Sequence, residues 1–276
     1  MCATCGCSGT AVVRLFPAGD EHEIHEHDSH EHPGHEHDSH EHPGHGHPGH
    51  EHPGREHERT VELQQKVLAK NDRLAEANRD WLRQRGVLAV NLMSSPGAGK
   101  TTLLEHTARD LAGQLAISVI EGDQAAALDA TRIRAAGCRV VQINTGVGCH
   151  LDAEMVAEGL RVLDPPGGSV VVIENVGNLV CPALFDLGEQ ARVVLASVTE
   201  GADKPLKYPH MFRSADLVLV SKTDLLPYVD FDTGRHAADV RKTSPGALML
   251  QLSVTAGTGL HDWYDWLRRR VLAPPE

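Results

Sequence analysis

The sequence contains no long apolar run and no basic stripe, and each absence excludes a class of protein. No stretch approaches the roughly 18 apolar residues that a membrane-spanning helix needs. Arg14 interrupts the only short apolar run near the start, so no signal peptide is expected. A basic stripe of the kind that binds nucleic acid is also lacking. We therefore expect a cytoplasmic protein that binds neither a membrane nor nucleic acid.

Acidic charge and histidine are concentrated in residues 20–57, which we call the histidine tract. It holds eleven Asp or Glu and one Arg, giving −10 of the formal net charge of −12, and 14 of the 19 histidines. A ten-residue unit, HEHDSHEHPG, occurs twice in 25–44 and in a changed form in 45–54. Prolines and the near absence of apolar side chains predict disorder without metal. Many imidazoles suit storage of nickel or zinc, although a solvated low-complexity tail is the alternative.

The rest of the chain has the periodicity of a folded domain. Apolar residues recur at helical spacing in 58–86, which predicts an amphipathic helix ended by Gly86. From Val87 onward, short Val, Ile and Leu runs alternate with helical stretches. Such runs are typical of strands buried on both faces, so we predict a mostly parallel sheet in a doubly wound α/β fold. The predicted strands are 87–93, 117–120, 138–143, 170–173, 193–196, 217–220 and 248–252.

The segment after the first of these strands has the pattern of a phosphate-binding loop, and we call residues 94–101 the phosphate loop. It reads SSPGAGKT and precedes a predicted helix at 101–111. Its two glycines let backbone N–H groups turn toward phosphate, the lysine would reach the terminal phosphates, and the threonine would bind Mg²⁺. This order of elements favours nucleotide binding over a glycine-rich turn without a ligand. The predicted phosphate-binding residues are Gly97, Ala98, Gly99, Lys100, Thr101 and Thr102.

A second loop indicates which nucleotide is bound. Lys222 and Asp224 directly follow the predicted strand 217–220. Asp224 would accept hydrogen bonds from the ring N–H and the amino group of guanine, a pair that adenine lacks, and Lys222 would lie along the base. Ser221 stands where the familiar motif has Asn. We therefore expect GTP, with an ordinary surface turn as the alternative.

Hydrolysis of GTP needs carboxylates near Mg²⁺. Glu174, at the end of an apolar strand, and Asp123, after another, are the candidates. With Lys100 and Thr101 they make up the predicted catalytic set. Neither a water-orienting glutamine nor an arginine finger is evident, so we expect the chain alone to hydrolyse GTP slowly.

Cysteines near the start predict a metal site. Without an export signal, the six cysteines are expected to be metal ligands or buried thiols rather than disulfides. Cys2, Cys5 and Cys7, which we call the amino-terminal cysteine cluster, can converge on one ion. A fourth donor, the α-amino group or a histidine, would complete a square-planar nickel site, whereas zinc would prefer a tetrahedron. Loose reduced thiols are the alternative.

A third group of candidate metal ligands lies inside the predicted domain. Cys149 and His150 follow the strand 138–143, and Cys181 follows the strand 170–173. Loops at the carboxyl ends of neighbouring strands meet, so these residues, the Cys–His–Cys group, can share an ion. Three protein ligands leave a position open for an ion that is passed on. Asp152 would complete the shell or cap a helix. The alternative is ordinary core cysteine, which we expect at Cys138.

Taken together, these motifs resemble the HypB family of hydrogenase nickel-incorporation GTPases. The resemblance covers the amino-terminal cysteines and nearly all of the chain from Val87. It rests on CATCGC at 2–7, NLMSSPGAGKTTLL at 91–104, GDQ at 122–124, TGVGCHLDA at 145–153, ENVGNLVCP at 174–182, DKPLKYP at 203–209 and SKTDLLPYV at 221–229.

The resemblance implies a GTP-dependent homodimer, of the SIMIBI class of P-loop GTPases, whose subunits share a metal site made by the Cys–His–Cys group. It also implies a high-affinity nickel site in the amino-terminal cysteine cluster. Nickel would be delivered to the large subunit of [NiFe]-hydrogenase with a HypA-type metallochaperone. The expected segments are then a cysteine motif at 1–19, the histidine tract at 20–57, the helix at 58–86 and a GTPase domain at 87–276.

The expected mechanism couples the nucleotide to the metal. Bound GTP and Mg²⁺ would order the loops that hold Asp123 and Glu174 and change the geometry of the Cys–His–Cys group, and hydrolysis would release the ion. Two alternatives remain at this point. One is a GTPase chaperone for another metal centre, such as that of urease or a zinc enzyme. The other is a nickel-storage protein with a vestigial nucleotide site.

Overall fold

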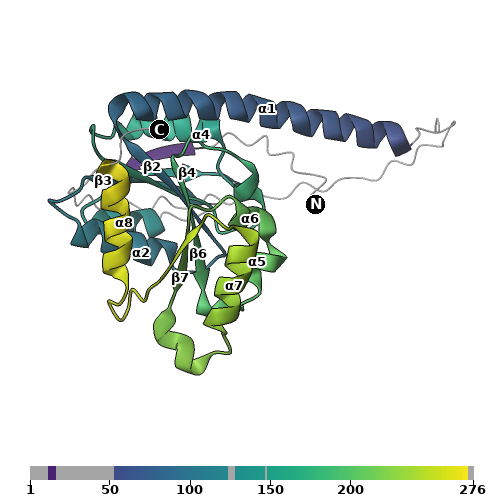
Figure 1. Ribbon diagram of the computed structural model, residues 1–276. Helices are drawn as coiled ribbons and strands as arrows, with labels where there is room; N and C mark the ends of the chain where they lie inside the picture. Colours follow the sequence, from purple (N-terminus) through teal and green to yellow (C-terminus); the bar gives the residue numbers. More distant parts are fainter. Residues whose placement is uncertain (1–11, 17–52, 124–127, 147, 273–276) are drawn as a thin grey trace, which may run out of the picture. The chain divides into compact units, whose positions relative to one another are not determined.

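The Val, Ile and Leu runs form one eight-stranded sheet within the residues that the computed structural model describes, which are 12–16, 53–123, 128–146 and 148–272 (Figure 1). The strand order is β1-β4-β3-β5-β2-β6-β7-β8, and all pairs are parallel except β1 with β4. Each predicted strand is present, with small differences at the ends. The strands from β2 to β8 are Leu88–Ser94, Ile117–Asp123, Arg139–Asn144, Val170–Glu174, Ala191–Ser197, Leu217–Ser221 and Leu248–Gln251.

Helices cover both faces of this sheet, which confirms the doubly wound α/β fold. On one face α2 and α8 contribute Leu103, Leu104 and Trp263 to the larger apolar core, together with α3. On the other face, α4 packs with α1, while α6 and α7 cover the far strands. None of the described helices is long and apolar enough to cross a membrane. The helices are α1 Pro53–Arg85, α2 Lys100–Asp110, α3 Leu128–Ala135, α4 Ala153–Leu163, α5 Lys204–Lys207, α6 Pro209–Arg213, α7 Thr233–Thr243 and α8 Leu260–Leu272.

The first strand is a correction to the expected organisation. No strand was predicted in residues 1–19, which were expected to be a cysteine motif, but β1, Val12–Phe16, adds an edge to the sheet by pairing with β4. Arg14 interrupts the apolar run, so the sequence pattern did not predict this strand. It is tolerated because an edge strand exposes part of its surface, and Arg14 and Leu15 are both exposed, while Val13 packs against the core. The amino-terminal cysteine cluster itself lies outside the described residues.

Helix α1 is longer than predicted. It begins at Pro53 rather than residue 58, and it ends at Arg85, where Gly86 takes a positive φ of 63° as a terminating glycine does. From Leu68 onward it belongs to the same compact unit as the sheet, and its residues before Leu68 belong to a second unit. Leu82 is fully buried against α4 residues such as Leu160. Residues 20–52 of the histidine tract lie outside the described residues.

The sheet topology brings the functional loops to one edge. The chain runs from the central strand β2 outward through β3 and β4, returns to β5, and then continues through β6 on the other side of β2. Ligands of open α/β sheets bind where the strand order reverses in this way, outside the carboxyl ends of the strands. At this edge, Asp123 and Glu174 are the last residues of β3 and β5, and the phosphate loop and the Cys149–His150 loop come after β2 and β4.

Candidate nucleotide and metal sites

The phosphate loop lines a cavity of about 460 Å³, which we call the nucleotide cavity. Gly97 and Gly99 have φ values of 73° and 103°, which glycine adopts without the steric cost of a side chain. The buried Lys100 ammonium donates to Ser94 Oγ at 3.0 Å. Burial lowers the pKa of Lys100, and the carboxylates of Glu174, Asp129, Glu121 and Glu200 oppose this. The loop therefore offers backbone donors and one cation to an anionic ligand.

Two buried carboxylates line the same cavity as Lys100. Glu174 Oε1 accepts from the Thr101 hydroxyl at 2.8 Å, and Glu174 lies beside Glu121 in the register of β5 and β3. The second oxygens, Glu174 Oε2 and Glu121 Oε2, are buried without a hydrogen-bond partner. Orphaned buried carboxylate oxygens are costly unless a cation is near, and oxygen is the ligand that Mg²⁺ prefers. The donor set therefore fits Mg²⁺.

The titration of these carboxyls reflects their burial. Burial raises the pKa of Glu174 to about 7, and the charge of Lys100 and the hydrogen bond from Thr101 oppose the rise. Burial and the charges of Glu174 and Asp123 raise the pKa of Glu121 to about 8. At pH 7, Glu121 is therefore mostly protonated and Glu174 is about half protonated, and a bound cation would displace these protons.

Replacing Glu121 with glutamine should stabilise the metal-free protein at pH 8. The folded pKa of Glu121 lies above its ordinary value of 4.5, so its stabilising contribution is complete below pH 4.5 and is lost as the pH rises toward 8. Glu121→Gln should raise the free energy of unfolding by on the order of 2 kcal/mol at pH 8 and hardly at all at pH 5. Urea unfolding in EDTA measures this. Glu158→Gln, at an exposed position of α4, should change neither value, and an equal gain at both pH values would contradict the assignment.

The structure brings the predicted nucleotide residues together and adds others. Lys100, Thr101, Asp123 and Glu174 all line the one cavity. Glu121, Asp129 and Arg132 also line it but were not predicted. Glu121 is an acid inside an otherwise apolar strand, a signal that the sequence did contain. Arg132 lies in α3 and forms ion pairs with Glu105 and Asp129. It belongs to no recognisable sequence motif, so it could not be predicted.

A second cavity of about 260 Å³ adjoins the phosphate loop and holds the predicted base-reading residues. Lys222 has a left-handed backbone with φ 59°, and its ammonium donates to Gly97 O at 2.7 Å. The Ser221 hydroxyl donates to Ala98 O at 2.9 Å, so this departure from the familiar motif ties the two loops together. Asp224 Oδ1 accepts from the Ser253 hydroxyl at 2.5 Å. Ser253, which was not predicted, orients the carboxylate.

The Cys–His–Cys group is assembled at the carboxyl edge of the sheet. Ligand atoms of Cys149, His150 and Cys181 all lie within 4.8 Å of one another, and Cys149 Sγ is 3.8 Å from His150 Nδ1. The His150 ring stacks on Phe185 with centroids 4.0 Å apart. Burial lowers the pKa of His150, partly opposed by the charge of Asp152, which favours the neutral imidazole that binds metal.

Asp152, two residues after His150, and Cys138, just before β4, have other contacts. Asp152 Oδ1 accepts from the backbone N–H of Met155 at 2.8 Å, so Asp152 caps α4. Cys138 is buried and its thiol donates to Ile117 O, and burial raises its pKa to about 12, as expected for a core cysteine. Cys149 and Cys181 are only half-buried, which distinguishes them from Cys138.

Comparison with known proteins gives the family. Residues 88–251 match the family described as "CobW/HypB/UreG, nucleotide-binding domain". A Rhizobium leguminosarum bv. viciae protein named hydrogenase maturation factor HypB is 53% identical over 210 residues, covering 76% of this chain and 70% of the relative. The chain belongs to the HypB family.

Solved structures of HypB proteins have the same fold. The HypB of Archaeoglobus fulgidus matches with a TM-score of 0.69 and 41% identity, over 74% of this chain and the whole of that one. The HypB of Helicobacter pylori, solved in complex with nickel, matches with a TM-score of 0.69 and 38% identity, over 73% of this chain and 95% of that one. Membership of the HypB family agrees with the resemblance noted from the motifs.

Proposed function

We propose that this protein is a GTP-hydrolysing nickel metallochaperone that stores nickel and inserts it into the large subunit of [NiFe]-hydrogenase, acting as a homodimer with a HypA-type metallochaperone. One observation carries the proposal: a backbone hydrogen bond joins a segment of the nucleotide cavity to the loop that bears two ligands of the Cys–His–Cys group. The Asp123 carbonyl, at the cavity, accepts from Thr145 N at 2.9 Å, and Thr145 begins the loop that bears Cys149. The names of the HypB relatives support the hydrogenase client.

The residues of the nucleotide cavity and of the adjoining second cavity have distinct roles. The phosphate-loop N–H groups and Lys100 bind the β- and γ-phosphates, and Asp224 selects guanine. Thr101, Asp123 and Glu174 hold Mg²⁺, which neutralises phosphate charge when bound. Because a hydroxyl has one proton and two lone pairs, Thr101 can keep donating to Glu174 while its oxygen serves as a ligand. With the arginine of the cavity wall tied to carboxylates, we expect slow hydrolysis.

The cargo ion is bound by the Cys–His–Cys group. Two thiolates and an imidazole suit nickel, and they suit zinc as well. Three protein ligands leave a position for a donor from the second subunit or from the protein that receives the ion. The amino-terminal cysteine cluster and the histidine tract, both largely outside the described residues, would serve as a high-affinity site and a store that supply this group.

The nucleotide state should change the nickel affinity of the Cys–His–Cys group about fivefold or more. Full-length protein is held at free Ni²⁺ concentrations fixed by a nitrilotriacetate buffer, so that ions on the histidine tract do not matter. Alkylation of Cys149 and Cys181 is then quantified peptide by peptide, with GDP or with a non-hydrolysable GTP analogue. The ratio of the two half-protection concentrations measures the coupling. A ratio of one would overturn the proposed coupling.

Replacing Asp224 with asparagine should weaken GTP binding by about 10- to 100-fold, because a charged acceptor for two guanine donors is lost. The asparagine amide can instead donate to the second carbonyl of xanthine. The affinity for XTP should therefore rise relative to the affinity for GTP. Competition of GTP, ATP and XTP with a fluorescent GDP measures both changes. Asp230→Asn, at an exposed position just beyond this loop, is the matched control. An Asp224→Asn variant that kept its preference for GTP would exclude Asp224 as the base reader.

A further inference from the structure

Asn175 lines the nucleotide cavity and reaches the loop that bears Cys149 and His150. It directly follows Glu174 and is 1% exposed. Its backbone N–H donates to Leu92 O at 3.1 Å, on the strand that leads into the phosphate loop. Its side-chain Oδ1 accepts from Leu151 N at 3.2 Å, and Leu151 directly follows His150. One residue thus adjoins a carboxylate of the nucleotide site and holds the backbone of a metal-ligand loop.

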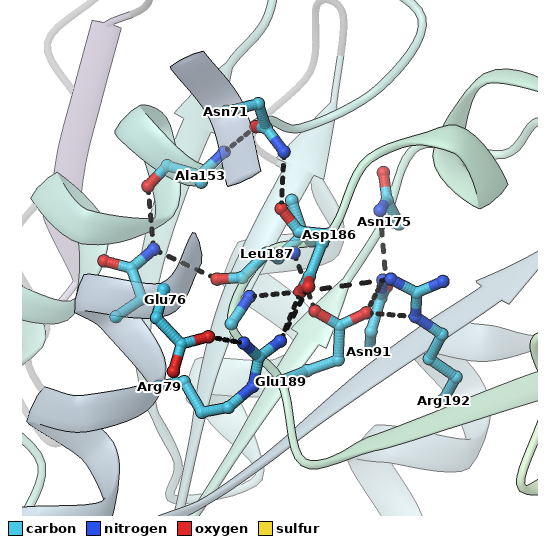
Figure 2. Close-up of polar contacts among 12 residues, drawn as sticks. Asn71, Glu76, Arg79, Asn91, Ala153, Asn175, Asp186, Leu187, Glu189 and Arg192 are labelled. Carbon is cyan, nitrogen blue, oxygen red and sulfur yellow. Dashed lines mark hydrogen bonds and ion pairs between the residues drawn. The ribbon is translucent and has the colours of Figure 1, made fainter. Parts of the chain in front are cut away.

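The Asn175 amide is held in a fixed orientation by a buried polar network (Figure 2). Its Nδ2 donates to Asn91 Oδ1 at 3.3 Å, and Asn91 Nδ2 donates to Glu189 Oε1 at 3.2 Å. Glu189 is in turn fixed by Arg192 Nε at 2.6 Å and by Leu187 N at 2.7 Å. Turning the amide would leave buried donors and acceptors unpaired, which costs free energy. The Oδ1 acceptor therefore points steadily at the metal-ligand loop.

The segments on both sides of this hydrogen bond are packed without space. A Cβ added at Gly177 would lie 2.9 Å from Pro96 Cα in the phosphate loop. A Cβ added at Gly122, beside Asp123, would lie 2.7 Å from the Leu151 side chain. Because close-packed segments cannot move independently, a shift of the segment 174–177 with the nucleotide reaches Leu151.

Asn71 provides a natural comparison. This buried asparagine of α1 also accepts from the metal-ligand loop, through Oδ1 from Ala153 N at 2.9 Å, and its Nδ2 donates to Asp186 O at 2.8 Å (Figure 2). It thereby joins the segment after His150 to the segment after Cys181. Asn71 hydrogen-bonds to no described residue of the nucleotide cavity. It can steady the Cys–His–Cys group without responding to the nucleotide.

We propose that Asn175 is the positioning residue that transmits the nucleotide state to the Cys–His–Cys group, through its hydrogen bond to the backbone of Leu151. This inference rests on the proposed function and deepens it, because it assigns the coupling to one side chain. Asn175 lines the nucleotide cavity, but it is 1% exposed and its side-chain amide is engaged with Leu151 N and Asn91 Oδ1. Its removal should therefore reduce the coupling more than it reduces either affinity.

The test uses full-length protein and the buffered Ni²⁺ assay with site-resolved alkylation of Cys149 and Cys181. In the wild-type protein, the half-protection concentration of Ni²⁺ with GDP should differ from that with the GTP analogue by about fivefold or more. In Asn175→Ala the ratio should fall to within about twofold of one. Asn71→Ala should weaken Ni²⁺ protection equally in both nucleotide states and keep the wild-type ratio. Because coupling is reciprocal, the factor by which Ni²⁺ changes affinity for the GTP analogue must fall in Asn175→Ala as well.

The outcomes separate the two proposals. A wild-type ratio of one refutes the proposed coupling itself, whatever Asn175 does. A wild-type ratio far from one that persists in Asn175→Ala refutes the role of Asn175 and leaves the proposed function standing. If the ratio also fell to one in Asn71→Ala, the loop would be loosened in general and the assignment to Asn175 would be wrong. If Asn175→Ala does not fold, Asn91→Ala, which removes the brace of the amide, decides: an undiminished ratio refutes the inference.

Discussion

Replacing Lys100 with alanine should lower GTP turnover by at least about 100-fold, the usual effect of removing a group that stabilises transition-state charge. Lys100 is the buried ammonium at the phosphate loop and faces several carboxylates across the cavity. Its charge is also the first influence that opposes the raised pKa of Glu174. Its loss removes a phosphate contact and leaves Glu174 more firmly protonated, so both GTP binding and chemistry should suffer. Phosphate release under single-turnover conditions measures the effect.

The controls for this experiment distinguish a GTPase from a nickel-storage protein with a vestigial nucleotide site. Lys207→Ala removes an exposed lysine whose partner is Asp203 and should leave turnover unchanged. Nickel bound to the histidine tract should be unaffected by Lys100→Ala, because the tract has its own imidazole ligands. Slow wild-type turnover that vanishes with Lys100 would exclude pure storage. Wild-type protein without any turnover dependent on Lys100 would instead favour the store with a vestigial nucleotide site.

The sheet and the phosphate loop could be predicted because their signals are local. Parallel strands buried on both faces are mainly apolar, so the apolar run 170–173 is recognisable in the sequence. The glycines of the phosphate loop are recognisable because its backbone needs their positive φ values. The Cys–His–Cys group was predicted by topology, since Cys149 and Cys181 follow strands whose carboxyl ends lie at one edge. The fold class thus followed from periodicity alone, and the metal group needed only the added rule about strand ends.

What could not be predicted depends on contacts between distant segments. Val12–Phe16 is a strand only because β4 offers it an edge. Ser253 matters only because the fold places it against Asp224. Asn175 stood in a motif that was interpreted through its glutamate, and the hydrogen bond to Leu151 gives the asparagine its role. Asp152 had two possible roles in the sequence, and only the Met155 contact separates them.

The replacement of Cys149 or Cys181 with serine should lower the Ni²⁺ affinity of the Cys–His–Cys group by at least about 100-fold. Changes that only touch the partners of metal ligands typically cost about 10- to 100-fold, so loss of a thiolate should cost no less. In Cys149→Ser, the remaining Cys181 should be alkylated at the same rate with and without buffered Ni²⁺. The reverse should hold for Cys149 in Cys181→Ser.

Two further variants decide whether the ion sits where the three ligand atoms converge. Cys138→Ser should leave the protection of Cys149 and Cys181 unchanged, because a serine hydroxyl can also donate to Ile117 O. Asp152→Asn should also leave it unchanged, since an amide oxygen can accept from Met155 N and cap α4 equally well. A loss of affinity in Asp152→Asn as large as that in Cys149→Ser would mean that Asp152 is a fourth ligand. An unchanged affinity keeps the fourth position open, as transfer of the ion to another protein requires.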